Sequence, residues 1–162
     1  MRARPATPAD AEAVSRIYNA GIEERIATFE TRHRRPEEML PEIGGAYPAV
    51  VVVSGGAVIA FATTSSYSPR ECYSGIAEFS VYTDPEKRGR GAGRLAMEAL
   101  IRESENRGFW KLLAKVFVEN VPSRKLLHSI GFREVGIHEH HARLDGTWRD
   151  IVLVEVLLRE NL

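Results

Sequence analysis

A glycine- and arginine-rich loop at residues 88–93, reading Arg-Gly-Arg-Gly-Ala-Gly, constrains this chain more than any other feature. A β-rich segment, Gly75–Thr83, precedes the loop, and a helical pattern over Arg94–Arg107 follows it. Glycines between a strand and a helix let backbone N–H groups approach an anion, and the amino end of the helix adds partial positive charge. The loop therefore predicts an α/β fold with a phosphate-binding turn. A tight turn with solvated arginines is the structural alternative.

Two common nucleotide-binding patterns are absent from this loop. A P-loop ends in Gly-Lys-Ser/Thr, whereas Gly93 is followed here by Arg94 and Leu95. The dinucleotide-binding fingerprint needs a glycine at the position of Arg94 and a strand near the start of a βαβ unit. The loop thus indicates neither a nucleoside triphosphate nor a dinucleotide.

Composition narrows the class of protein. The chain has 162 residues, 44% of them hydrophobic, with 22 basic and 22 acidic side chains. This length predicts one domain over residues 1–162, with a core that needs no metal or disulfide. Balanced charge gives no reason to expect nucleic acid or a membrane as partner. The lone cysteine, Cys72, excludes an internal disulfide, and the polar amino-terminal sequence carries no signal segment, so we expect a cytoplasmic protein.

The rest of the chain alternates between strand and helix patterns. The predicted strands are Ala49–Ser54, Ala57–Thr64, Gly75–Thr83, Lys111–Val118, Phe132–Leu144 and Thr147–Leu158. The predicted helices are one that starts at Thr7, with Gly21 as its end or a kink, and three over Pro36–Leu40, Arg94–Arg107 and Pro122–Ser129. Gly55-Gly56 and Asp145-Gly146 predict hairpin turns. The pattern predicts a mixed α/β fold with much antiparallel pairing.

The glycine loop also resembles a family signature. It matches the Arg/Gln-x-x-Gly-x-Gly/Ala motif of the GNAT superfamily of N-acetyltransferases, and Asn120, Ser123 and Gly131-Phe132 resemble that family's downstream Asn-x-x-Ser…Gly-Phe segment. The resemblance implies a GNAT fold: a central, mostly antiparallel sheet of about seven strands flanked by about four helices. It also implies acetyl-CoA as cosubstrate and no metal. The coenzyme-binding residues it implies are Phe79, Val81, Arg88, Gly89, Arg90, Gly91, Ala92, Gly93, Asn120 and Ser123.

Further segments resemble one branch of that superfamily, the phosphinothricin N-acetyltransferases, which includes enzymes acting on arsinothricin and on methionine sulfone or sulfoximine. These segments are Ile17-Tyr18-Asn19, Ala27-Thr28-Phe29-Glu30-Thr31, Arg70-x-x-Tyr73, Ala77-Glu78-x-x-Val81-Tyr82 and Trp148-x-Asp150. The resemblance implies direct transfer of acetyl to the α-amine of a small anionic or polar amino acid. It also implies a homodimer.

Glu78 is the candidate general base. An α-amine is largely protonated near neutral pH, and a carboxylate partly removed from water can take up its proton because burial raises a carboxyl pKa. A strand glutamate is by default a solvated residue, and the resemblance is what implies the base role. Arg70 and Tyr73 precede Glu78 at the spacing at which the branch carries its contacts to the substrate anion, and Phe29 would wall the pocket. A guanidinium and a phenol suit a phosphinate, arsonate or carboxylate.

The chain departs from the branch at the proton donor. The branch often has histidine four residues before the glycine of the Gly-Phe pair, where this chain has Leu127, with His128 one residue on. One residue turns a helical side chain by about 100°, so His128 is not assigned as the acid. Tyr82 or water is the candidate donor to the departing thiolate, and departure of the thiolate without a donor is the third alternative.

Two groups of residues are left without a catalytic role. His138-Glu139-His140-His141 could place two histidines on one face of a strand, but no cysteine or second ligand cluster accompanies them, so no metal site is predicted. Cys72 lacks the histidine and acid that mark a nucleophile.

Two other functions stay open at this stage. The acceptor could be another amine, such as a protein amino terminus, a polyamine or an aminoglycoside. A polyamine site would present clustered carboxylates, whereas the residues near Glu78 are Arg70 and Tyr73. The chain could also hold acyl-CoA as a sensor without turnover.

Overall fold

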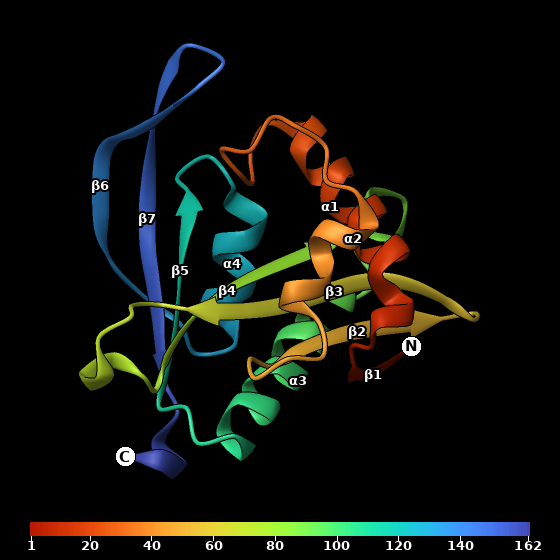
Figure 1. Ribbon diagram of the computed structural model, residues 1–162. Coiled ribbons are helices and arrows are strands. Elements are labelled where there is room, and N and C mark those ends of the chain that lie inside the picture. The colour runs from red at the N-terminus through yellow and green to blue at the C-terminus, as the bar shows by residue number, and fades with distance from the viewer.

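One seven-stranded sheet, seen in the computed structural model of all 162 residues, runs through the molecule in the order β1-β2-β3-β4-β5-β7-β6 (Figure 1). Its strands are β1 (Arg2–Pro5), β2 (Ala49–Ser54), β3 (Ala57–Ser66), β4 (Ile76–Thr83), β5 (Lys111–Phe117), β6 (Arg133–Leu144) and β7 (Thr147–Leu157). Only β4 and β5 pair in parallel. The predicted mixed α/β fold with a mostly antiparallel sheet of about seven strands is confirmed.

The strand that the sequence pattern did not single out is β1. Its residues pair with Val50 to Val53 of β2 at the edge of the sheet. Arg2-Ala3-Arg4-Pro5 has neither the β-branched residues nor the alternation that mark a strand. The extended conformation of β1 comes from its pairing with the apolar strand β2, a tertiary contact that a local pattern does not contain.

The α-helices are α1 (Ala11–Glu24), α2 (Pro36–Met39), α3 (Ala92–Asn106) and α4 (Val121–Ser129). The prediction that the first helix ends at Gly21 is wrong, because the helix continues one turn further, to Arg25 in the left-handed region. Gly21 instead accommodates the ring of Tyr82: a Cβ there would lie 2.7 Å from Tyr82 Cδ1. α3 begins at Ala92, so the end of the glycine loop is already its first turn.

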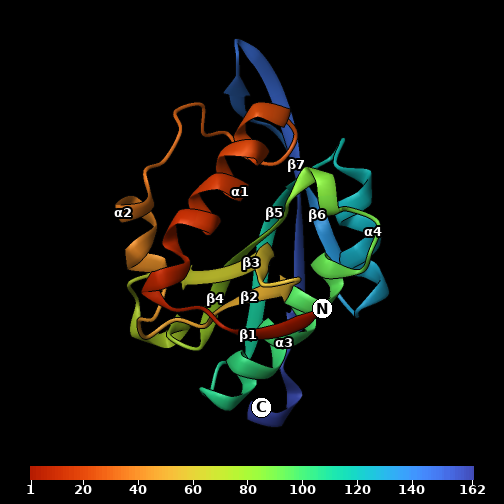
Figure 2. The ribbon, with the colours of Figure 1, turned by 90° about the vertical axis from the view of Figure 1, so that its right-hand side faces the viewer.

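The helices cover both faces of the sheet (Figure 2). Val50 and Val52 of β2 pack in the larger core with α3 and α4, whereas the alternate residue Val51 packs in a second core with α1. Alternate residues of a strand point to opposite faces, so α1 and α3 lie on opposite sides of the sheet. No helix in the structure combines the length and the apolar character that a membrane span requires.

The sheet opens in its middle. β4 and β5 pair only at Ile76, Ala77 and Glu78 of β4, opposite Lys111 to Leu113 of β5. Beyond these pairs β4 stays with β3 and β5 stays with β7, so the two strands diverge, as Figure 1 shows. Strands that part in this way leave backbone N–H and C=O groups free for a ligand.

Candidate active site

The glycine loop forms the entrance to α3. Gly89 and Gly91 have φ values of 76° and 83°, a region that strains residues with a side chain. None of the backbone amides of residues 88–94 donates to a backbone carbonyl. The first turn of α3 also carries no acidic side chain. Free amides at the positive end of a helix are an arrangement that can bind an anion, which is the role that the sequence predicts for this loop.

The two arginines of the loop have different surroundings. The Arg88 guanidinium forms a forked ion pair with Glu24 at the end of α1, with Nη1 2.6 Å from Oε2. This hydrogen bond raises the pKa of Arg88 above its usual value. Arg90 is exposed. Sequence analysis missed Glu24, because its partner is remote in the chain and nothing local marks it.

A cavity of about 410 Å³ opens beside the loop, between α1, α3 and α4. A smaller hollow of about 60 Å³ lies between the diverging parts of β4 and β5. Both are lined by Ala27, Val81, Tyr82, Asn120 and Ser123, so they adjoin. Of the other predicted coenzyme contacts, Arg88, Gly89, Gly91, Ala92 and Gly93 line the larger cavity, Phe79 lines the smaller hollow, and Arg90 lines neither.

The start of α4 borders both cavities. Asn120 caps this helix, its Oδ1 accepting a hydrogen bond of 3.3 Å from the backbone N–H of Ser123. One turn on, Leu127 is buried and lines the smaller hollow, so the position where the branch often has histidine presents only carbon. His128 is exposed and lines a separate hollow with Arg133 and Glu134.

Glu78, the predicted base, is less buried than expected. Its side chain is 37% exposed, and Oε1 lies 3.6 Å from Nζ of Lys115. Glu78 itself lines neither cavity, whereas Lys115 lines the smaller hollow. Sequence analysis missed Lys115, although a lysine within the apolar strand Leu-Leu-Ala-Lys-Val-Phe was a usable signal.

Tyr82 packs on the α1 face of the sheet. Its ring stacks on Phe61 at 5.5 Å and meets Tyr18 edge-on at 5.1 Å. Burial raises the pKa of Tyr82 well above its usual value, and a hydrogen bond with Thr28 lowers it only in part, so the phenol keeps its proton at neutral pH. Tyr82 lies four positions after Glu78, about 13 Å along β4, so the two side chains do not meet.

The three predicted substrate contacts, Phe29, Arg70 and Tyr73, line neither of the two cavities. Arg70 and Tyr73 lie in the exposed connection between β3 and β4, with the guanidinium 5.6 Å from the ring centroid. Phe29 packs on Phe117 at 4.7 Å, beside a small core at the far end of β5. Phe29 is therefore held by apolar packing, and Arg70 by stacking in an exposed turn.

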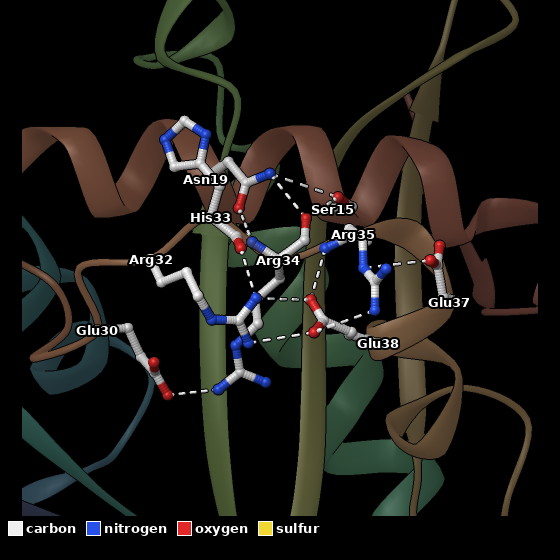
Figure 3. Close-up of polar contacts among 9 residues, drawn as sticks. All are labelled: Ser15, Asn19, Glu30, Arg32, His33, Arg34, Arg35, Glu37 and Glu38. Atoms are coloured by element: carbon white, nitrogen blue, oxygen red, sulfur yellow. Dashed lines mark hydrogen bonds and ion pairs between the residues drawn. The ribbon is translucent and has the colours of Figure 1, made fainter.

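Side chains of α1 fix the segment between α1 and α2 by hydrogen bonds to the backbone of Arg34 (Figure 3). The Asn19 side chain accepts from the Arg34 N–H at 2.8 Å and donates to the Arg34 carbonyl at 2.9 Å, and Ser15 donates to the same carbonyl. Glu30 and Arg34 form an ion pair within the segment. These contacts fix one end of the segment to α1. The same segment contains Thr28 and Ala27, and Ala27 lines both cavities.

The histidine cluster lies on the projecting hairpin of β6 and β7. The ladder is irregular between His138 and Ala142, and Asp150 Oδ1 accepts from the backbone N–H of His140 at 2.8 Å. The rings of His138 and His141 are 4.9 Å apart, and no group of three or more metal-ligating side chains occurs in the structure. Cys72 is exposed.

An opened sheet beside a loop of unpaired amides is a geometry suited to a ligand with a phosphate group, and comparison with known proteins gives the family. The sequence pattern of the acetyltransferase (GNAT) family matches residues 14–132. The chain belongs to this family.

Similar proteins are known from both sequence and structure. YwnH of Bacillus subtilis is 33% identical over 95% of this chain and 97% of its own. The L-methionine sulfoximine/L-methionine sulfone acetyltransferase of Salmonella typhimurium is 28% identical over 99% of this chain and 96% of its own. The phosphinothricin acetyltransferase of Sinorhizobium meliloti, solved in complex with AcCoA, superimposes with a TM-score of 0.89 at 28% identity, covering 96% of this chain and 87% of its own.

Proposed function

We propose that residues 1–162 form one N-acetyltransferase domain that moves acetyl from acetyl-CoA to the α-amine of a small anionic or polar amino acid. The observation that carries the proposal is the continuity of three features: the unpaired amides of residues 88–94, the adjoining cavities, and the opening between β4 and β5 with Glu78 at its edge. The similarity to acetyltransferases of methionine sulfone and phosphinothricin supports this acceptor class.

The diphosphate of the coenzyme would bind the free amides of the glycine loop, with Arg90 and Arg88 nearby. Its thiol arm would follow the cavity past Asn120 and Ser123 into the smaller hollow, where Phe79 and Val81 line the wall. A backbone N–H on the freed edge of β4 would polarise the thioester carbonyl.

The reaction then needs two proton movements. The acceptor ammonium gives a proton to Glu78, directly or through one water, and the free amine attacks the thioester carbon. The N–C bond forms, the C–S bond breaks, and the nitrogen releases its second proton while the thiolate takes one up. Leu127 offers no proton, so water is the donor we favour, with the Tyr82 phenol as the alternative.

The test is an acceptor screen with acetyl-CoA and phosphinothricin, arsinothricin, methionine sulfone and methionine sulfoximine. We expect product with at least one of them, and a loss of about 10²- to 10⁴-fold in kcat for Glu78→Gln. Glu12→Gln, an exposed change in the first turn of α1, is the matched control and should leave kcat unchanged. Full activity of Glu78→Gln would reject the base. Acetylation only of proteins, polyamines or aminoglycosides would favour the second acceptor class, and tight coenzyme binding with no product would favour a sensor.

The proposal includes a homodimer. Every residue of β6 from Arg133 to His141 is exposed at the edge of the sheet, and Val135 and Ile137 on it and Trp148 on β7 are large exposed apolar side chains. Proteins usually cover or blunt such an edge. The molar mass from light scattering should be twice that of the chain, and a monomer at all concentrations would exclude the dimer.

A further inference from the structure

Lys115 is a cation at the opening of the sheet for which the proposed reaction has no role. Its Nζ lies 3.6 Å from Oε1 of Glu78, its side chain is 47% exposed, and it lines the hollow between β4 and β5. By contrast, Lys111 on the same strand is 25% exposed and is held at 3.2 Å by the more buried Glu155. The Lys115 ammonium is the more accessible of the two and lies next to the proposed base.

Both members of this pair belong to the face of the sheet opposite α3. Ala77 and Phe79, the neighbours of Glu78, pack in the core under α3, and so do Ala114 and Val116, the neighbours of Lys115. Alternation along a strand therefore directs Glu78 and Lys115 to the other face. The glycine loop leads into α3 itself, so a donor bound there and an acceptor beside Glu78 would meet through the opening from opposite sides.

We propose that Lys115 binds the carboxylate of an α-amino acid acceptor while Glu78 receives the proton of its α-amine. The inference rests on the proposed function. The two charged groups of an α-amino acid are joined through one carbon atom, so their partners must be immediate neighbours, as Glu78 and Lys115 are. A bound amino acid would replace the Glu78–Lys115 ion pair by two contacts, its ammonium with Glu78 and its carboxylate with Lys115. The Glu78–Lys115 pair is exposed, so its separation costs little free energy.

The same lysine selects against other amines. A polyamine would place a second positive charge next to the Lys115 ammonium and would be repelled by it. A carboxamide would place a neutral group there, so Lys115 would keep only Glu78 as its charged partner. Lys115 thus acts as a specificity-determining residue that recognises the α-carboxylate, whichever side chain the acceptor carries.

The test compares one acceptor with and without its carboxylate: methionine sulfone and its α-carboxamide, each with saturating acetyl-CoA. Lys115→Met should lower kcat/KM for the acid by about 10- to 100-fold, chiefly through KM, and leave the carboxamide within about threefold. Lys115→Arg keeps the charge and should retain most of the activity. Lys125→Met, an exposed change on the outer side of α4, is the matched control.

The outcomes separate the two claims. Equal losses on acid and carboxamide would overturn the inference and make Lys115 a proton donor or a structural partner of Glu78, with the proposed function intact. No loss on either acceptor would also overturn it. A wild-type chain that acetylates the carboxamide or simple amines but no amino acid would overturn the proposed function, and the carboxylate contact with it.

Discussion

The ion pair between Glu24 and Arg88 gives a sharp prediction for coenzyme affinity. Glu24 lines the larger cavity and occupies the guanidinium of a loop arginine whose amides are free for a diphosphate. A carboxylate at that place both competes for Arg88 and repels a phosphate anion. Glu24→Gln should therefore lower the KM for acetyl-CoA while leaving kcat unchanged.

The magnitude follows from the exposure of the pair. The side chains of Arg88 and Glu24 are 49% and 31% exposed, so solvent screens the interaction and the pair contributes about 0.2–1 kcal/mol to stability. Repulsion between two charges about 4 Å apart in bulk water is likewise about 1 kcal/mol. Together these effects amount to about 1.2–2 kcal/mol, which corresponds to an about 8- to 30-fold lower KM. Loss of the ion pair itself, at most about 1 kcal/mol, should lower the Tm by at most about 4 °C.

The assay is steady-state acetylation at low and high salt, because screening should shrink the effect as ionic strength rises. Glu23→Gln, which removes the same charge from the neighbouring residue with an exposed partner in His33, is the matched control and should leave the KM unchanged. A rise in KM for Glu24→Gln would refute the reasoning, since it would show that Glu24 positions Arg88 for the coenzyme.

Two further predictions concern stability. In Gly75→Ala the added Cβ would lie 2.0 Å from Trp110 Cε3, so we expect a loss of about 3 kcal/mol or more; a Tm within about 2 °C of wild type in a thermal scan would contradict this. The Arg4 guanidinium holds the pKa of the buried Asp10 carboxyl below its usual value. The folded pKa lies below the unfolded one, so this stabilisation is fully present above about pH 4 and is lost as the pH falls through the folded pKa. Urea unfolding should therefore show Asp10→Asn less stable than wild type at pH 7, with a difference that shrinks as the pH falls below about 4, and a pH-independent difference would contradict the linkage.

Much of the fold and of the coenzyme side of the site could be predicted because it depends on short-range pattern. Gly89 and Gly91 adopt the positive φ that only glycine tolerates well, and the loop leads into a helix as the local sequence indicates. Strands β2, β3, β4, β5 and β7 follow segments rich in apolar residues. The edge strand β1 was missed because its conformation depends on pairing with Val50 to Val53. The last turn of α1 was missed because Gly21 makes room for the ring of Tyr82 and does not end the helix.

The positions of the residues proposed to bind the acceptor could not be predicted from the sequence, because they depend on tertiary contacts. No local pattern tells that β4 and β5 part after Glu78, that Lys115 then lies beside it, or that Phe29 turns to Phe117. The sequence by itself determined the family, the sheet and the anion-binding loop, since backbone conformation and hydrophobic periodicity are written in neighbouring residues. Only the tertiary structure decided which charges meet, because an ion pair depends on the relative position of two strands and not on either strand alone.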